Sequence, residues 1–378
     1  MKRQPRLVFF KEPADPGSHV TDRVKLPVEH FLNHFSQENP FNPFHEMIGQ
    51  DLAKRTLRRA AIDALMRWDH MCSKNFLVTG PSSVGKTTLV RLFAKILRLP
   101  LVEIAPRSVT NMDEFFRAIR NALSNHHRDD GTKTPIPLVA LGSGNHYELP
   151  PCIIFIDEAH ALHRNLQNEL LKAIEAKDRQ FGTDKGDVVS TTNVCWFFAT
   201  TEVGDLFGPL LNRFTEIILN PYTKAQIAEI VHLNFPHWTK EACKVVAHFE
   251  NRVPRRAIAF AATLDDEMRQ RPNADKYNLA LEVAEEFQID PMGLHLRHLQ
   301  ILKLVADKPM SKARLAQHLQ ISENELVRVV APPIMMETED MPSLITVCQQ
   351  GYAITPAGWN ELVKRELKVG NHKAQIME

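Results

Sequence analysis

Short apolar runs alternate with amphipathic stretches through the middle of the chain. The runs are "NFLVT", "PLVEIA", "CIIFIDE", "VCWFFATT" and "EIILNP". Between them apolar positions recur with helical spacing, and in "GQDLAKRTLRRAAIDAL" we expect Leu52, Leu57, Ala61 and Leu65 near one face. Buried strands that alternate with helices are typical of a parallel sheet covered on both sides. The pattern therefore predicts an α/β fold.

Outside this region the pattern changes. Residues 1–40 are rich in proline and mixed charge and predict an extended arm with one short helix around "VEHFLNHF". Residues 125–150 break the strand–helix rhythm and predict a surface insertion of low regularity. We therefore expect five parts: an arm at 1–40, the alternating α/β region at 41–220, a helical region at 221–288, a winged helix at 289–370 and a tail at 371–378.

The winged helix is predicted from three helices followed by a hairpin. "SKARLAQHL" is expected as the second helix with Ser311 as its N-cap, and "ISENELVRVV" as the third. "LITVCQQGYAIT" is expected to form a two-stranded wing around Gly351. The third helix of such modules often enters the major groove of DNA, but here Glu323 and Glu325 would repel phosphates. Groove reading is therefore not expected, and a role in packing or protein contact stays open.

Composition narrows the functional classes. The net charge of +1 over 378 residues gives no overall attraction to nucleic acid, so DNA binding would need a local patch. Basic candidates for that patch are Lys364, Arg365 and Lys368 in the final helix. The five cysteines are far apart and form no CxxC pair, which argues against a disulfide framework or a zinc site. Because no signal peptide or long apolar run is present, we expect a soluble cytoplasmic protein without a membrane span.

The strand "FLVT" runs into a loop that matches GxxxxGK[ST]. The loop consists of Gly80, Pro81, Ser82, Ser83, Val84, Gly85, Lys86 and Thr87, and Thr88 follows it in the helix. Glycines let the backbone turn its N–H groups toward phosphate oxygens, and the helix that follows presents its positive end to the same anion. Lys86 would reach the β- and γ-phosphates, and the Thr87 hydroxyl would ligate Mg²⁺. The loop predicts a site for ATP and Mg²⁺.

A second part of this site is predicted at "CIIFIDEAH". Four apolar residues form a buried strand, and its end presents Asp157 and Glu158. Asp157 would hold Mg²⁺ through water, and Glu158 would orient and polarise the attacking water. The pair therefore predicts hydrolysis as well as binding.

The order of these motifs resembles that of the AAA+ ATPases, and most closely the RuvB family of Holliday-junction branch-migration motors. "IGQDLAKRTLRRA" precedes the phosphate loop, "ATT" ends the fourth strand, and "PLLNRF" and "RVPRRAIAF" follow. The likeness runs from about Phe44 to Trp359. It implies an AAA+ P-loop domain with a parallel sheet, a small α-helical lid domain and a C-terminal winged helix.

The resemblance assigns further residues to the site. Thr200 or Thr201 matches the polar sensor beside the γ-phosphate, and Arg213 matches the arginine finger that completes a neighbouring subunit's site. Such an arginine implies a homo-oligomeric ring, a hexamer in this family. The matches to nucleotide-binding positions are Ile48 and Gly49 near adenine, Tyr222 after the last strand, and the lid's sensor arginine Arg255.

Some segments depart from the family pattern. "DEAHAL" stands where the family usually has "DEIHRL", and the wing carries Gln349 and Gln350 where the family contacts DNA with arginines. Residues 178–193 occupy the place of the hairpin that binds a junction-recognition partner. This segment is polar, and an apolar patch for a partner would have to come from Phe181, Val188 and Val189.

Three functions follow from these observations. The first is a RuvB-like motor that hydrolyses ATP and moves on four-way junction or duplex DNA without sequence specificity. The second is an AAA+ loader or remodeller that assembles proteins on DNA. The third is a nucleotide-dependent switch that binds a protein partner, which Glu158 and Arg213 argue against because turnover, not binding, requires them.

Overall fold

A computed structural model describes residues 7–10, 24–27, 43–66, 74–126, 133–141, 145–175, 177–250 and 253–375. The chain divides into two compact units. The first consists of residues 1–80 and 85–219, and the second of residues 81–84 and 220–378. Among the residues described, no helix has the length and apolar character that crossing a bilayer requires.

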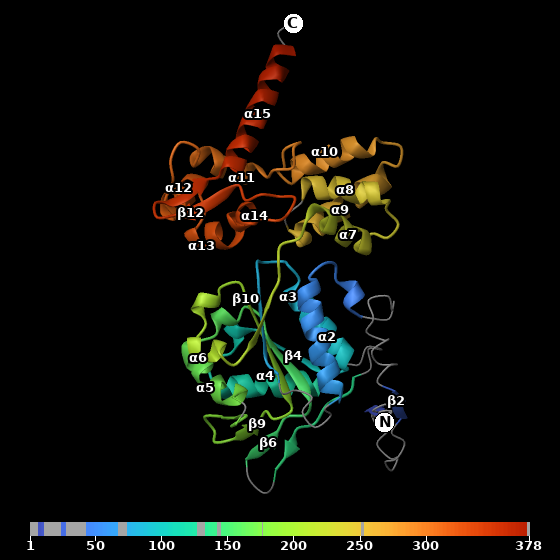
Figure 1. Ribbon diagram of the computed structural model, residues 1–378, viewed down its shortest axis with the longest axis vertical. Coiled ribbons are helices and arrows are strands. Elements are labelled where there is room, and N and C mark those ends of the chain that lie inside the picture. The colour runs from blue at the N-terminus through green and yellow to red at the C-terminus, as the bar shows by residue number, and fades with distance from the viewer. Residues whose placement is uncertain are drawn as a thin grey trace, which may run out of the picture. The chain divides into compact units, whose positions relative to one another are not determined.

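The first unit is built on a five-stranded parallel sheet (Figure 1). Its strands are β3 (Phe76–Thr79), β4 (Leu101–Ile104), β7 (Cys152–Ile156), β10 (Val194–Thr200) and β11 (Thr215–Ile218). Their order in the sheet is β11-β3-β10-β7-β4. Every residue of β3, β7 and β10 is buried, as expected for strands covered on both faces. The predicted α/β fold is confirmed.

Helices flank this sheet in the first unit. They are α2 (Asp51–Met66), α3 (Lys86–Leu97), α4 (Met112–Ser124), α5 (Arg164–Ile174) and the short α6 (Gly208–Leu211). Leu57 and Ala61 of α2 are fully buried and share one face, as expected, but Leu52 is 69% exposed, so its assignment to that face was wrong. The side chain of Leu65 lies outside the described residues. Ala53 takes the buried place in the first turn, because it lies one turn before Leu57 on the same side of the helix.

A second, four-stranded sheet lies in the same unit, in the order β5-β6-β9-β8. The strands are β5 (Val139–Ala140), β6 (His146–Glu148), β8 (Gln180–Gly182) and β9 (Val188–Ser190). The expectation of low regularity for residues 125–150 was therefore wrong, since this segment supplies β5 and β6. Strand β6 pairs in parallel with β9, so it covers one edge of the β8–β9 hairpin.

The apolar residues of that hairpin face inward. Phe181 is 2% exposed and Val189 is fully buried, and both belong to the core of the first unit. Phe181 packs edge-on against Phe115 and Phe116, with ring centroids about 6 Å apart. Only Val188 is partly exposed. Phe181 and Val189 are therefore not available for an apolar partner-binding patch, because both are already used in the core, and contact of this hairpin with a partner stays a prediction.

The arm contains two short strands, β1 (Leu7–Phe10) and β2 (Val24–Pro27), which pair antiparallel. The helix expected around "VEHFLNHF" lies outside the described residues.

The second unit begins with a group of helices. They are α7 (Lys224–Asn234), α8 (Lys240–Phe249), α9 (Pro254–Gln270) and α10 (Lys276–Glu286). Thr223 and Gln226 start α7 with reciprocal side-chain-to-backbone hydrogen bonds, a capping box that fixes where the helix begins. Phe249 stacks on Phe260, with ring centroids 5.6 Å apart, and joins α8 to α9.

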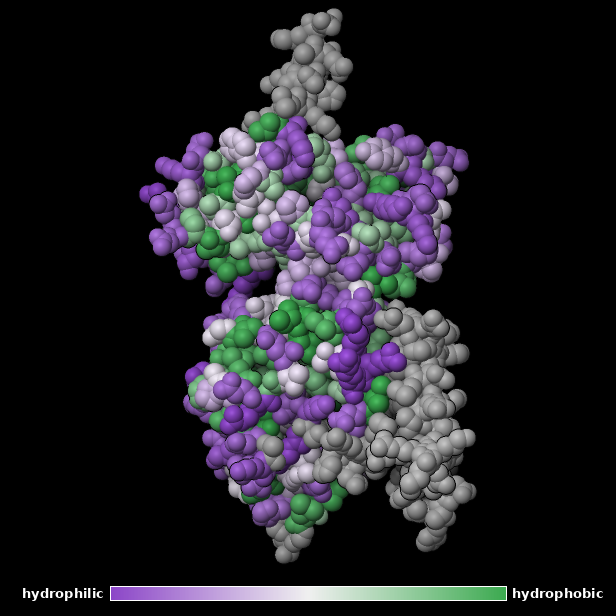
Figure 2. All heavy atoms as spheres, in the orientation of Figure 1, coloured by the Kyte–Doolittle hydropathy of each residue, from purple (hydrophilic) through white to green (hydrophobic). Residues whose placement is uncertain are grey.

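The winged helix follows in the same unit, as predicted. It contains α11 (Leu296–Leu304), α12 (Lys312–Leu319), α13 (Glu323–Glu325), the π-helical turn η6 (Leu326–Val330), α14 (Pro332–Met335), β12 (Ile345–Cys348), β13 (Gly351–Ile354) and α15 (Pro356–Gln375). Ser311 caps α12 through the Arg314 N–H. Gly351 has φ +121°, and a Cβ there would lie 2.2 Å from the Met310 carbonyl oxygen, so the wing requires glycine. In Figure 2, hydrophilic and hydrophobic residues are interspersed over the visible face of this unit.

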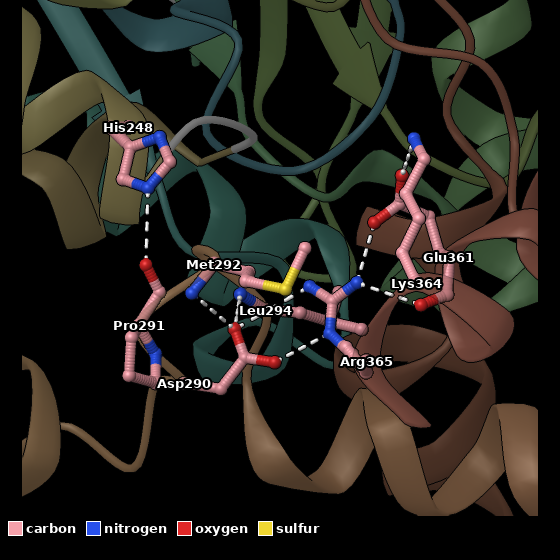
Figure 3. A network of polar contacts seen from close by, with 8 residues as sticks. All are labelled: His248, Asp290, Pro291, Met292, Leu294, Glu361, Lys364 and Arg365. Atoms are coloured by element: carbon pink, nitrogen blue, oxygen red, sulfur yellow. Dashed lines mark hydrogen bonds and ion pairs between the residues drawn. The ribbon is translucent and has the colours of Figure 1, made fainter. Parts of the chain in front are cut away.

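Arg365 of α15 is an internal residue and not the basic surface candidate that was expected. It is 8% exposed and forms ion pairs with Asp290 and Glu361 (Figure 3). The Asp290 carboxylate also accepts the backbone N–H groups of Met292 and Leu294. Because its guanidinium is used inside the unit, Arg365 is not free to contact DNA phosphates.

Candidate nucleotide site

The phosphate loop joins the end of β3 to the start of α3. Gly80 has φ +141°, Gly85 +95° and Ser83 +63°. A Cβ on Gly80 would lie 2.4 Å from the Leu219 carbonyl oxygen, so only glycine fits where the loop leaves the strand. Helix α3 begins at Lys86, so its free N–H groups point back toward the loop. Anions bind favourably at such helix starts.

Lys86 lies across the base of this loop. Its residue is 6% exposed, and Nζ donates a hydrogen bond to the Gly80 carbonyl oxygen at 3.0 Å. Burial lowers the pKa of the Lys86 ammonium, and the charges of Glu158 and Asp157 oppose that shift. A phosphate bound in the loop would add its negative charge to those of Glu158 and Asp157 and would further favour the charged form of Lys86.

Thr87 and Asp157 meet although they come from α3 and from the end of β7. The Thr87 hydroxyl donates to Asp157 Oδ2 at 2.7 Å, and Asp157 Oδ1 accepts the Glu158 N–H at 3.0 Å. A hydroxyl and a carboxylate beside an anion-binding loop are the oxygen donors that Mg²⁺ takes together with substrate phosphates. These residues therefore fit a nucleotide-bound Mg²⁺.

Glu158 projects from a strained turn directly after β7. Its φ is +51°, an uncommon conformation for a residue with a side chain, and the side chain is 48% exposed. Its Oε2 lies 3.3 Å from His160 Nδ1 and accepts the Thr201 hydroxyl at 3.4 Å. An exposed carboxylate at this place is able to reach a water molecule in the site.

The two sensor candidates have different surroundings. Thr200 is fully buried, its hydroxyl oxygen accepts the Glu202 N–H at 3.0 Å, and it lies 3.0 Å from His160 Nδ1. Thr201 is exposed and contacts Glu158. Thr200 pairs with Thr79 in the sheet, which places it beside the residue that precedes the phosphate loop. Both threonines thus lie with Glu158 at the carboxyl ends of the parallel strands.

His160 is the residue that sequence reasoning missed. It belongs to the "DEAH" segment, and its side chain, 8% exposed, lies between Thr200 and Glu158. The signal in the sequence was a histidine two positions after the Glu158 carboxylate, but its other neighbour, Thr200, comes from a strand 40 residues away.

Arg213 lies at the end of the sheet where the parallel strands begin, opposite the end that carries the phosphate loop. It precedes β11, whose first residue Thr215 pairs with Phe76 at the start of β3, whereas the phosphate loop follows the end of β3. A four-residue strand spans about 13 Å, so Arg213 is remote from its own loop. Its Nη2 lies 3.1 Å from Glu175 Oε1, and its side chain is 33% exposed. This place is consistent with an arginine that acts outside its own site.

The remaining candidates are spread over both units. The Tyr222 hydroxyl donates to the Val84 carbonyl oxygen at 3.0 Å, so this buried tyrosine supports the phosphate loop. Ile48 and Gly49 lie in the loop before α2, and Gly49 has φ +60°. Arg255 is exposed in the first turn of α9. Nucleotide contacts by these residues stay predictions.

Comparisons with known proteins agree with this architecture. The family model described as "ATPase family associated with various cellular activities (AAA)" matches residues 76–222. The RuvB subunit of the Holliday junction branch migration complex from Fervidobacterium nodosum is 26% identical over 334 residues, covering 84% of this chain and 87% of the relative. The corresponding subunit from Thermotoga petrophila is 27% identical over 307 residues, covering 77% and 83%.

Solved structures give the same result for the fold. A mutant of Thermotoga maritima RuvB matches with a TM-score of 0.65 at 23% identity, covering 85% of this chain and 97% of that one. The Thermotoga maritima RuvB Holliday junction branch migration motor matches with a TM-score of 0.63 at 22% identity, covering 83% and 95%. The predicted resemblance is confirmed along most of the chain.

Proposed function

We propose that this chain, a RuvB-like AAA+ ATPase, is an ATP-hydrolysing motor that moves the branch point of four-way DNA junctions. The observation that carries the proposal is the cluster of Lys86, Thr87, Asp157, Glu158 and Thr200 at one sheet edge. This cluster lies in a chain of which 84% is aligned with a RuvB subunit.

The residues of the cluster have separate tasks. The loop N–H groups and Lys86 would bind the phosphates, and Thr87 and Asp157 would hold Mg²⁺, which neutralises charge on the phosphates. Glu158 would orient water, and Thr200 would contact the γ-phosphate. Catalysis of phosphoryl transfer depends mainly on such positioning and charge stabilisation.

A complete site would require a second copy of the chain. Arg213 lies at the sheet edge away from its own phosphate loop, so its charge would serve a neighbour's nucleotide. An arginine supplied in this way is worth about 10³ or more in rate. We therefore propose a homo-oligomeric ring with six subunits, the number that the resemblance to the RuvB family implies. Any junction-recognition partner would contact the polar surface of hairpin 178–193, because Phe181 and Val189 are buried.

The winged helix favours the loader or remodeller as a second candidate. Glu323 pairs with Lys312 at 3.3 Å and Glu325 with Arg297 at 3.2 Å, so two of the basic residues near the third helix are paired with carboxylates. The wing carries Gln349 and Gln350, and Arg365 is internal. Few phosphate contacts per subunit are therefore expected, with weak DNA binding of shallow salt dependence until subunits assemble.

ATPase activity with and without a four-way junction separates the candidates. The motor requires that junction DNA stimulates turnover and that labelled junctions resolve into product duplexes only with ATP. Glu158→Gln protein, which retains the binding residues, is the control for movement without hydrolysis. Turnover that linear duplex stimulates equally, without junction movement, would favour the loader. Nucleotide binding with no turnover under any condition would favour the protein-binding switch.

A further inference from the structure

One ring nitrogen of His160 faces two oxygens at once. Nδ1 lies 3.0 Å from the Thr200 hydroxyl and 3.3 Å from the Glu158 carboxylate. A nitrogen that carries one hydrogen, or none, cannot donate to the carboxylate and accept from the hydroxyl in the same state. The proton position on the ring therefore decides whether Nδ1 accepts from Thr200 or donates to Glu158.

The surroundings of Thr200 connect this choice to the nucleotide. Its hydroxyl oxygen accepts the Glu202 N–H, and the hydroxyl hydrogen can be donated as well. It goes either to His160 Nδ1 or to an acceptor in the site. Since Thr200 lies beside Thr79, just before the phosphate loop, that acceptor would be a phosphate oxygen.

We propose that His160 is a positioning residue that links Thr200 to Glu158, so that occupancy of the γ-phosphate position determines how Glu158 is held. This inference rests on the proposed ATPase function. Without a γ-phosphate, the Thr200 hydroxyl donates to Nδ1 and the imidazole carries its hydrogen on Nε2. With a γ-phosphate, Thr200 donates to it, and the imidazole hydrogen moves from Nε2 to Nδ1 by exchange with water. Nδ1–H then donates to Glu158 and orients the carboxylate toward the attacking water.

Substitution of His160 tests the effect on turnover. His160→Ala should lower kcat for ATP by about 10²-fold, the loss expected when a catalytic group is misplaced by about 1 Å. Nucleotide affinity should stay at the wild-type level, because no phosphate-binding group is removed. His160→Asn should recover part of kcat, since its amide nitrogen takes the place of Nδ1. His163→Ala, which changes an exposed histidine three residues further along the chain, is the matched control and should behave as wild type.

A double-mutant cycle tests the route through Thr200. If Thr200 acts on Glu158 through His160, the loss of kcat in the Thr200→Val, His160→Ala protein is smaller than the sum of the two single losses in free energy. Additive losses would overturn the proposal. So would wild-type kcat in His160→Ala, or an alanine defect that appears only as lower thermal stability and that His160→Asn does not relieve.

A spectroscopic measurement gives a result that does not depend on turnover. In protein with ¹⁵N-labelled histidines, the nitrogen shifts report which ring nitrogen carries the hydrogen, and comparison with His160→Asn assigns the signal. We expect hydrogen on Nε2 without nucleotide and on Nδ1 with a non-hydrolysable ATP analogue. The same form in both states would overturn the proposal. A protein that hydrolyses ATP but moves no junctions would refute the motor and leave this inference standing.

Discussion

Lys86 and Glu158 would act on different parts of the reaction, although both lie at one sheet edge. Lys86→Ala should abolish ATP binding, because it removes the buried cation at the loop. Glu158→Gln should bind ATP at wild-type affinity and lose turnover, because an amide does not polarise water as a carboxylate does. Titration with a fluorescent ATP analogue and steady-state ATPase rates measure the two effects separately.

The control for this pair is Lys95→Ala on the same helix. Lys95 is exposed, and its ion pair with Glu46 at 2.8 Å is a surface pair worth about 0–1 kcal/mol. It should retain both binding and turnover. Equal loss of nucleotide affinity in Lys86→Ala and Glu158→Gln would contradict the division of roles.

His295 should make the second unit less stable in acid. Burial, and then the charges of Arg256 and Arg297, lower its pKa from 6.5 to about 4. Between these values the unfolded chain binds a proton that the folded chain does not. Stability contributed by neutral His295 is therefore complete above pH 6.5 and is lost as the pH falls toward 4. Thermal unfolding measured from pH 7.5 to 4 should show this decline.

The substitution His295→Asn isolates that contribution. His295 caps α11 by accepting the Arg297 N–H through Nδ1, and asparagine is a good N-cap that does not titrate. The variant should keep its stability at pH 7 and show a shallower decline in acid. His318→Asn, which changes an exposed histidine of α12, should decline as wild type does. An identical decline in all three proteins would refute the role of His295.

Among whole elements, the β8–β9 hairpin is expected to contribute stability through its apolar side chains. Phe181→Ala removes a 2% exposed ring packed against two phenylalanines and should cost about 3–5 kcal/mol. Leu52→Ala, at a 69% exposed position of α2, should stay within about 0.5 kcal/mol of wild type. Urea unfolding gives both values. A small effect of Phe181→Ala would mean that its ring contributes little to the stability of the first unit.

Elements with a strong pattern in their own residues were predictable from the sequence. The central strands are continuous apolar runs, and burial on both faces follows from that pattern alone. The insertion was not predictable, because β6 is stabilised by pairing with β9, where His146 meets Val188. Short strands with mixed polarity carry no periodic signal of their own. Whether they form depends on pairing with strands that are distant in the sequence.

The same distinction holds for the site. The phosphate loop and Asp157 are fixed by contiguous motifs, so their meeting through Thr87 was expected. The place of His160 between Thr200 and Glu158 depends on how two strands pack, which no local motif contains. Arg365 was misjudged for a related reason, since its partner Asp290 lies 75 residues away along the chain.

At the scale of the whole molecule, the trans action of Arg213 predicts complementation between inactive subunits. Arg213→Ala protein retains its own phosphate loop, and Lys86→Ala protein retains its own finger. Mixed rings should therefore contain some interfaces with an intact loop facing an intact finger, and ATPase activity should reappear on mixing. Glu175→Ala should leave this recovery in place, because Glu175 contacts Arg213 within one chain and not across an interface.

Exchange of subunits has to be shown independently, by energy transfer between labelled proteins. With exchange demonstrated, absence of recovered activity would mean that Arg213 does not complete a neighbour's site. Mixing either variant with itself at the same total concentration is the control.

The position of β3 in the sheet has a consequence for the order of events during synthesis. β3 pairs with β10 on one side and β11 on the other, so its first strand partner exists only after residues 194–200 are made and its second only after residues 215–218. From Thr79 to Ile218 is 139 residues (218 − 79), which takes roughly 7–28 s at about 5–20 residues per second. During that time the residues of the phosphate loop have been synthesised, but the strand that positions them does not yet have both of its neighbours in the sheet. ATP therefore cannot assist the early folding of this chain, and a product that stops before β10 would be released without a nucleotide site.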